Sequence, residues 1–405
     1  MSFEFFISKR LIKSENTTSA NRILRIAIVS VSLSVAVMLI SISVLTGFKN
    51  SIKDKITGFG SHIQIIPFTS SSLYSDTPIY ISDSNVKSLS DNQNIKFITP
   101  VLNKSAVIIK ESSFHAIILK GITSSYDTTF FYEALVKGNM PHLNKNSKQE
   151  VIVSKSIADK MNLSINDKIK IYFYINDSYR SKNFYVSGIY NTGLGDYDDR
   201  FLICDASILQ NLFSFTDTSF SSYEVAIKDF SLLQSSAEYI YNRLPHHLTV
   251  QTITDIEPNL FSWLNLLDSN VIMIIIVMML VIIVALSSVI LIMIFESKKM
   301  IGTLKSFGAS NNSIITIFLY KAGYTTLKGL LYGNILAITL ELIQKYTHLI
   351  HLNPQSYYIT SVPININPLH FILIDLGIFV ICMFCMLIPT RSITKISIVK
   401  NLRFE

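Results

Sequence analysis

The chain has 405 residues, of which 16% are charged and 49% are hydrophobic, and its mean hydropathy is +0.40. This much apolar surface must face something other than water, which argues against a simple soluble enzyme and favours a membrane protein. The formal charge of +7 is not gathered into Lys/Arg clusters with interleaved aromatic residues in the polar regions. We therefore expect no nucleic-acid partner.

Four stretches are apolar over the roughly 20 residues that a helix needs to cross a bilayer. The first begins near the N-terminus, but it is too long for a cleaved signal peptide and no small-residue cleavage pattern follows it, so we expect it to be retained as an anchor. The four predicted spans are residues 26–45, 271–295, 314–342 and 369–388.

The charges that flank these spans predict their orientation. Lys and Arg gather before the first span, between the second and third, and after the fourth. Short cytoplasmic segments collect such residues, so both termini are expected in the cytoplasm, with residues 48–268 and about 343–368 outside. The first eleven residues, with Phe3, Phe6 and Leu11 on one helical face, predict a short interfacial helix before the first span.

The long segment between the first two spans has a different pattern. Short runs rich in Ile, Val, Tyr and Phe alternate with clusters of Asn, Asp, Ser and Gly, which indicates a mixed α/β domain. A strand, a helix and a strand over residues 224–253 close it, so we expect a core built from both ends of the domain with a β-rich insert at about 140–215. Strands are predicted over residues 62–68, 106–110, 114–121, 150–153, 168–175, 183–190 and 201–204.

The predicted architecture is therefore an α-helical membrane protein with one helix, a large α+β extracytoplasmic domain and then three helices. Its predicted parts are residues 1–47, with the interfacial helix and first span, the domain over 48–268, and 269–405 with the last three spans.

Recognised catalytic patterns are absent from the sequence, so we do not expect an enzyme. There is no phosphate-binding GxxxxGK[ST] loop, no HExxH, no GxSxG and no His/Cys cluster with metal-ligand spacing. Asp196, Asp198 and Asp199 follow two glycines and could form a cation site, but we favour a glycine-acid turn between strands. Cys382 and Cys385 have CxxC spacing inside an apolar segment, where we interpret them as packing residues rather than a redox pair.

A segment directly after the second span carries the strongest functional signal. Met300, Ile301, Leu304 and Phe307 are spaced for one apolar face of a short helix, and Gly308 is placed to end it. From these features alone, a helix along the membrane surface and an ordinary basic loop are about equally supported. The segment as a whole, residues 296–310, reads ESKKMIGTLKSFGAS.

This segment resembles the coupling helix of permease subunits in the MacB/FtsX superfamily of ABC transporters, in particular the lipoprotein-releasing LolC/LolE branch. The resemblance extends over nearly the whole chain through further matches in the family's order: Thr46-Gly-Phe-Lys49, Gly138-Asn-Met-Pro141, Glu150 to Ala158, Gly188-Ile-Tyr and Gly195-Asp-Tyr-Asp198. The residues matched to the coupling helix are Glu296, Lys298, Lys299, Ile301, Gly302, Leu304, Lys305, Gly308, Ala309 and Ser310.

The resemblance implies a non-catalytic permease of the bacterial inner membrane that pairs with a second permease and binds a cytoplasmic ATPase dimer. It implies no cofactor in this chain, because ATP is bound by the partner, and a lipoprotein as substrate. Members that recruit a periplasmic carrier have a long loop between the two strands before the glycine-acid turn. Here that hairpin tip spans only about residues 176–182 and has no proline, so the resemblance leaves carrier docking open.

Two other functions fit the superfamily. An FtsX-like regulator of cell-wall hydrolysis would have a smaller outside domain and a longer acidic N-terminus. A MacB-like efflux subunit usually has a fused ATPase, for which the 25 residues before the first span leave no room. Both are weaker predictions than lipoprotein release.

Charged and small residues within the spans predict helix contacts. Lys328 and Asp375 lie at matching depths of about 21 Å from the cytoplasmic face, so we expect them to pair between spans three and four. Lys321 is expected to extend towards the cytoplasmic interface. Small residues at every fourth position let helices approach closely; we expect contact within the chain for Gly329, Gly333 and Ala337, and contact with the partner permease for Ser30 and Ser34.

Overall fold

A computed structural model describes residues 4–8, 19–68, 78–110, 113–143, 149–175, 177–353 and 357–395. The chain divides into two compact units. The first comprises Met1–Lys49, Trp263–Ile350 and Ser361–Glu405, and the second comprises Asn50–Ser262 and His351–Thr360.

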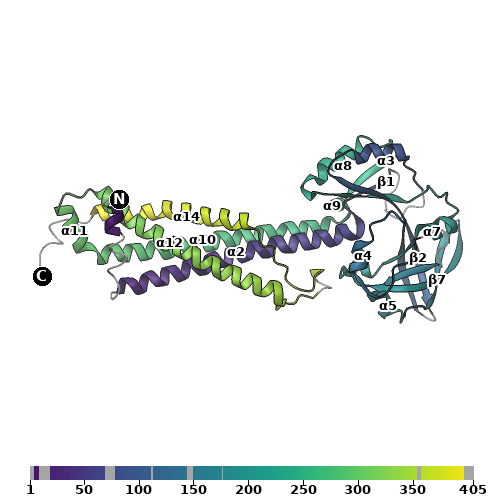
Figure 1. The fold of residues 1–405 in the computed structure, drawn as a ribbon, viewed down its shortest axis with the longest axis horizontal. Coiled ribbons are helices and arrows are strands. Elements are labelled where there is room, and N and C mark those ends of the chain that lie inside the picture. Colours follow the sequence, from purple (N-terminus) through teal and green to yellow (C-terminus); the bar gives the residue numbers. More distant parts are fainter. Residues whose placement is uncertain are drawn as a thin grey trace. The chain divides into compact units, whose positions relative to one another are not determined.

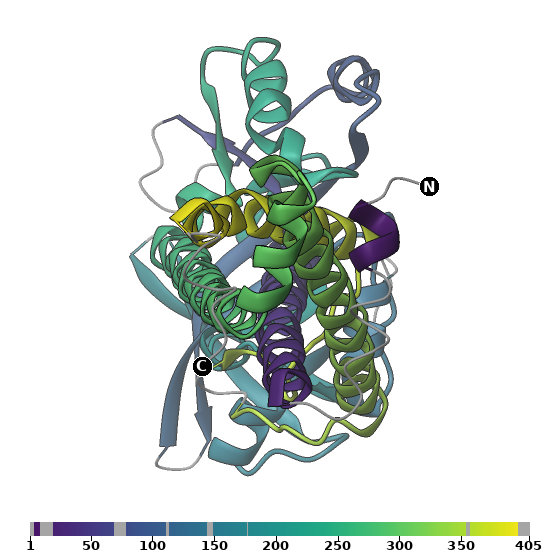
Figure 2. The ribbon, with the colours of Figure 1, turned by 90° about the vertical axis from the view of Figure 1, so that its left-hand side faces the viewer.

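The first unit is a helical bundle. Its four long helices run side by side in Figure 1, and Figure 2 shows α2 between α10 and α12. All four helices are long and apolar enough to cross a membrane, and each contains one of the predicted spans. They are α2 (Ser19–Gly60), α10 (Pro258–Glu296), α12 (Asn311–Thr347) and α14 (Pro368–Thr390), with the short α11 (Lys298–Ser306) and the 3₁₀ helix η2 (Arg391–Lys395).

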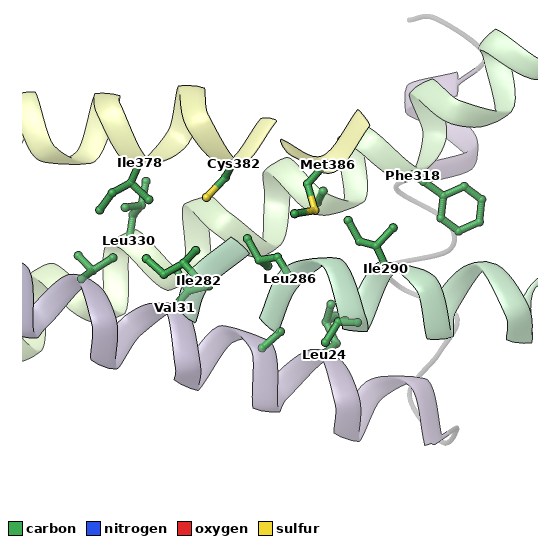
Figure 3. Packing of buried hydrophobic residues seen from close by; sticks show 14 of the residues in the cluster. Leu24, Val31, Ile282, Leu286, Ile290, Phe318, Leu330, Ile378, Cys382 and Met386 are labelled. Carbon is green, nitrogen blue, oxygen red and sulfur yellow. The ribbon is translucent and has the colours of Figure 1, made fainter. Parts of the chain in front are cut away.

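A close-packed apolar cluster holds the bundle together. Val31 of α2, Ile282 of α10, Leu330 of α12 and Ile378 of α14 belong to it and point towards one another in Figure 3. Cys382 is fully buried in the same cluster and Cys385 packs against it, and neither forms a disulfide. The interpretation of these cysteines as packing residues is thus confirmed.

Helix α2 is much longer than a bilayer requires. Its 42 residues correspond to about 63 Å, against roughly 30 Å for a hydrocarbon core. The sequence pattern explains the extension, because Phe48, Ile52, Ile56 and Phe59 recur at helical spacing and all four are buried. The division between the two units falls within this helix, after Lys49.

The second unit contains one sheet of ten strands, ordered β10-β1-β9-β2-β3-β8-β5-β7-β4, with β6 paired to β2 and β7. The strands are β1 (Ile63–Pro67), β2 (Ile95–Lys110), β3 (Ser113–Ile122), β4 (Leu135–Gly138), β5 (Glu150–Ser154), β6 (Lys168–Ile175), β7 (Ser178–Tyr190), β8 (Phe201–Asp205), β9 (Ser222–Ile227) and β10 (Leu248–Thr252). Every predicted strand is present, while β4 was not predicted.

The two ends of this domain meet in the sheet, as predicted. Strand β1 pairs antiparallel with both β9 and β10, so the closing strand-helix-strand unit encloses the first strand. Beyond it, β2, β3, β8, β5, β7 and β6 are each paired with the next, and β6 pairs back with β2, which closes a ring of six strands. Strands β5 to β8 of the predicted insert complete this ring together with β2 and β3.

Short helices connect these strands. They are α3 (Asp83–Ser90), α4 (Thr129–Glu133), α5 (Lys155–Lys160), α6 (Gly195–Asp198), α7 (Ala206–Phe213), the 3₁₀ helix η1 (Phe230–Leu232), α8 (Leu233–Tyr241) and α9 (Ile253–Ile256). Of these, only the helix between β9 and β10 was predicted.

Candidate functional site

Helix α11 follows α10 after a single residue. Ser297 continues the backbone hydrogen bonding on both sides, because its N–H donates to Met293 and its carbonyl accepts from Ile301. Ile301 and Gly302 are buried, and Met300 and Leu304 pack against the apolar cluster of the bundle. The helix is therefore fixed to the bundle along one face, as the apolar spacing predicts.

The end of α11 and the start of α12 are built from three consecutive residues. Gly308 has a φ of +90°, and the N–H groups of Gly308 and Ala309 donate to the carbonyls of Lys305 and Leu304, which is a Schellman motif. The Ser310 hydroxyl then accepts from the Ser313 N–H and caps α12. The predicted role of Gly308 is confirmed.

The remaining side chains of α11 fall into two groups. Lys305 reaches back to donate to the Ile393 carbonyl at 3.0 Å, which ties α11 to η2. Lys298 lies 4.7 Å from the centre of the Phe295 ring. Glu296 and Lys299 are exposed, and Phe307 is 83% exposed, so its placement on the packed face is wrong. It is the C-cap residue, at the very end of α11.

Helical residues also lie near the N-terminus. Residues 4–8 are helical, Glu4 accepts a hydrogen bond from Ser313 at 3.2 Å, and Phe5 packs edge-on against Tyr320. The predicted interfacial helix is therefore helical over 4–8 and contacts the first turns of α12, while residues 1–3 and 9–11 lie outside the described residues.

A buried ion pair, which sequence reasoning missed, lies in the second unit. Lys120 of β3 contacts Glu224 of β9 at 2.8 Å, and both side chains are 2% exposed. Lys120 also donates to the Phe59 carbonyl at the end of α2 at 2.5 Å and to Tyr126 at 2.9 Å, and Tyr126 donates to Glu224. Burial lowers the pKa of Lys120, and the Glu224 carboxylate opposes that shift.

This cluster anchors the end of α2 in the sheet. The terminal carbonyls of a helix carry partial negative charge, so a cation beside Phe59 is favourable. The alternation of Leu119, Lys120 and Gly121 within an apolar run was the one available signal, since a lone lysine in a buried strand requires a buried partner.

The acidic turn after β7 is a structural element. Asp198 accepts hydrogen bonds from the Thr192 hydroxyl at 2.7 Å and from the N–H groups of Thr192 and Gly193. Asp199 pairs with Lys160 at 2.9 Å, and Asp196 is exposed. Within the described part of the chain, no group of His, Cys, Asp and Glu is arranged to hold a metal ion. The predicted glycine-acid turn is present.

A family model of the MacB-like periplasmic core domain matches residues 26–242, which is more than half of the chain, and a model of the FtsX-like permease C-terminal region matches residues 272–398. The chain belongs to the MacB/FtsX superfamily of permeases.

Similar proteins include several of the LolC type. The permease is 20% identical over 395 residues to the lipoprotein-releasing system transmembrane protein LolC of Xylella fastidiosa, covering 94% of this chain and 93% of that protein. It is also 20% identical to the LolC protein of Buchnera aphidicola subsp. Schizaphis graminum, with 78% of each chain covered. An uncharacterized ABC transporter permease of Methanocaldococcus jannaschii is 23% identical over 215 residues, 51% of this chain and 52% of that one.

Solved structures with a related domain were also found. The extracellular domain of the noncanonic ABC-type transporter YknZ from Gram-positive bacteria is 16% identical, with a TM-score of 0.34 and coverage of 47% of this chain and 99% of that one. The periplasmic region of MacB from Actinobacillus actinomycetemcomitans is 18% identical, with a TM-score of 0.33 and coverage of 51% and 95%.

The predicted ion pair inside the bundle of the permease is not formed. Asp375 of α14 accepts a hydrogen bond from Asn334 of α12 at 2.8 Å. Lys328 lies 4.6 Å from the centre of the Tyr324 ring on its own helix. Asn334 is six residues beyond Lys328, which is about 9 Å along α12 and about 240° around it, so depth alone did not place the contact.

Lys321 also departs from expectation. Its side chain does not extend along a lipid-facing surface, because Lys321 is 3% exposed within α12. Glu341, near the other end of α12, is 1% exposed.

The small residues of α12 pack within the chain, as predicted. A Cβ added at Gly333 would lie 2.7 Å from the Val35 Cβ of α2, and one at Gly329 would overlap Val31. Ala337 is fully buried. Ser34 of α2 is 3% exposed, so its predicted contact with a partner permease is wrong: the bundle itself covers that face. Ser30 is half-buried, and its predicted partner contact remains a prediction.

Proposed function

We propose that this chain is the membrane subunit of an ABC transporter that releases lipoproteins from the bacterial inner membrane, driven by a separate cytoplasmic ATPase dimer. The observation that carries the proposal is the geometry of α11. One face of this short helix is fixed to the bundle through Ile301 and Leu304, while Phe307 at its C-terminal end is exposed.

Such a helix suits the transmission of movement between subunits. Interfaces are anchored by a few large side chains that fill pockets of the partner, and an exposed phenylalanine is a suitable anchor. The packed face is continuous with α10 through Ser297 and with η2 through the Lys305 hydrogen bond. Displacement of α11 by the ATPase would therefore reach both α10 and η2.

The remaining parts of the proposal follow the superfamily. Both termini and α11 lie in the cytoplasm, the domain between α2 and α10 is outside, and the membrane is crossed once before the domain and three times after it. A second permease, identical or related, completes the complex. This chain catalyses no reaction and binds no nucleotide, since ATP is bound by the ATPase. The lipoprotein substrate is supported by the similarity to LolC proteins along nearly the whole chain.

A periplasmic carrier, if one takes part, would bind elsewhere than at the β6–β7 hairpin. Ile175 pairs with Ser178 in the register of these strands, so only two residues connect them, with Asp177 at a φ of +57°. The connection between these two strands is therefore too short to form a long loop that could bind another protein.

The test is reconstitution of the full chain with its ATPase and second permease in liposomes that contain a lipoprotein. We expect ATP-dependent release of the lipoprotein by the wild-type complex. Phe307→Ala should weaken ATPase binding at least tenfold, because an interface anchor is worth about 2 kcal/mol or more. Phe384→Ala is the matched control, since Phe384 is 69% exposed on α14 and not on α11.

Two results would contradict the proposal in different ways. ATPase binding that is unaffected by Phe307→Ala would remove α11 as the coupling element. ATP-dependent turnover without release of any lipoprotein would retain the coupling and reject the substrate.

A further inference from the structure

The ring of six strands carries an apolar groove on one face. The groove has a volume of about 1150 Å³ and is lined by β2, β3, β6 and the start of β7. Its floor comes from Val107, Ala116 and Tyr172, which the strand register places side by side. Phe114 and Tyr179 stand at its edges with 79% and 81% of their surface exposed. Water-exposed apolar surface of this extent marks a binding site.

The chemistry of the lining favours a hydrocarbon ligand over a protein. A protein interface forms about one hydrogen bond per 100–200 Å². Here most of the accessible surface of the lining is apolar, and the Tyr174 hydroxyl is already bonded to Asp177 at 3.0 Å. The volume exceeds the roughly 300–1,000 Å³ of pockets that enclose drug-sized molecules, so the groove can take more than one acyl chain.

A cation marks one end of the groove. Arg200 lines it, and its backbone is fixed because the Arg200 carbonyl accepts from the Ile118 N–H at 2.7 Å. Among the described residues the Arg200 guanidinium has no hydrogen-bond or ion-pair partner. The neighbouring Asp199 does not neutralise it, since that carboxylate pairs with Lys160 at 2.9 Å.

A second cation lies beside one of the aromatic rings that line the groove. Lys170 of β6 is 5.2 Å from the centre of the Tyr172 ring. Arginine and lysine beside an apolar site favour an anionic head group, because phosphate accepts charge-assisted hydrogen bonds.

We propose that this groove binds an anionic diacyl phospholipid, with its acyl chains over Val107, Ala116 and Tyr172 and its phosphate at Arg200. The site lies within the second unit and does not depend on the ATPase or on the lipoprotein substrate. It would give the extracytoplasmic domain a lipid ligand of its own.

The experiment uses the full chain in nanodiscs that contain a phosphatidylglycerol with a photoreactive group on one acyl chain. After illumination, mass spectrometry identifies the labelled peptides. We expect labelling of peptides from β2, β3 and β6 in addition to the membrane helices. A probe with a phosphatidylcholine head group should label these strands roughly fivefold less, the effect expected for one basic residue near a lipid head group.

Two variants separate the parts of the site. Ala116→Trp fills the groove and should reduce strand labelling at least tenfold, and it should not disturb folding because Ala116 is exposed. Gln234→Trp, on the exposed side of α8, is the matched control and should have no effect. Arg200→Glu should abolish the preference for phosphatidylglycerol while the wild-type melting temperature is retained.

The proposal would be overturned by labelling confined to the membrane helices, or by strand labelling that Ala116→Trp leaves unchanged. Equal strand labelling by the two lipid probes would also reject it, because the net negative charge of the head group would then contribute nothing to binding beside Arg200. Cross-linking of the groove to a second protein chain in place of lipid would assign the surface to a protein partner instead.

Discussion

Mutation can separate the two ways in which the Lys120–Glu224 pair affects stability, through its charge and through its packing. Lys120→Met keeps the length of the side chain but leaves the Glu224 carboxylate buried without its cation. Removing one partner of a buried pair costs about 3–5 kcal/mol. We expect the melting temperature of the second unit, followed by circular dichroism of the full chain, to fall by on the order of 10 °C.

The double variant Lys120→Met with Glu224→Leu is the control for this prediction. It removes both charges, so most of the lost stability should return. A double variant as unstable as the single one would show that the lysine contributes through its other contacts, such as the Phe59 carbonyl, and not through the ion pair.

His62 gives the second unit a dependence on pH. Burial and the nearby Lys96 lower the pKa of His62 to about 4, and its Nδ1 accepts a hydrogen bond from the Ile227 N–H. The unfolded chain therefore binds more protons than the folded one between about pH 6.5 and 4, so stability falls as pH falls through this range.

The expected loss is about 1–2 kcal/mol after allowance for partial solvent screening. His62→Gln should flatten the dependence of the melting temperature on pH between 7 and 4.5, whereas His246→Gln, at an exposed position, should leave it as it is. The same slope in both variants would exclude His62 as its source.

At the scale of helices, the close contact between α2 and α12 depends on glycine, which has no side chain, at positions 329 and 333 of α12. Gly333→Ala would bring a Cβ within 2.9 Å of the Ser32 carbonyl oxygen and still closer to Val35, and this backbone cannot yield without moving the helix. Overpacking of this kind costs about 1–3 kcal/mol. We expect a lower melting temperature of the bundle in detergent, with partial recovery when Val35→Ala is added.

Gly323→Ala on the same helix is the matched control. Its Cβ would lie 3.5 Å from the Met383 sulfur, which is ordinary contact, so stability should be kept or slightly raised by the better helix former. Equal losses at Gly323 and Gly333 would indicate a general effect of alanine and not a close approach of two helices.

The helices differ in how much of their arrangement could be predicted. The spacing of small residues correctly predicted which face of α12 packs closely within the chain. Gly329 and Gly333 lie one turn apart on the same side of this helix. The matching membrane depths of Lys328 and Asp375 did not predict a contact correctly. Depth gives the position of a side chain along the helix axis but not its direction around that axis. The extension of α2 was predictable from Ile52, Ile56 and Phe59, whose helical spacing continues the apolar face beyond the lipid-length run.

At the scale of the whole molecule, the local sequence pattern predicts where strands lie better than it predicts which strands pair. The alternation in β6, where Ile169, Ile171 and Phe173 are buried and Lys168 and Lys170 are exposed, is visible in the sequence. The pairing of β1 between β9 and β10 is not, because it joins residues separated by more than 150 positions. Closure of the ring by β2 and β6 is likewise a long-range contact, and so the groove that depends on it could not be predicted.

The junction at Gly308, Ala309 and Ser310 leaves no spare residue between α11 and α12, since the cap of one helix is followed at once by the cap of the next. Adding or deleting a single residue there would shift α12 by about 100° about its axis, and the glycine stripe would no longer face α2. Chain length at this point is therefore as strictly constrained as residue identity. Homologous permeases that keep this architecture should vary in sequence across the junction without insertions or deletions.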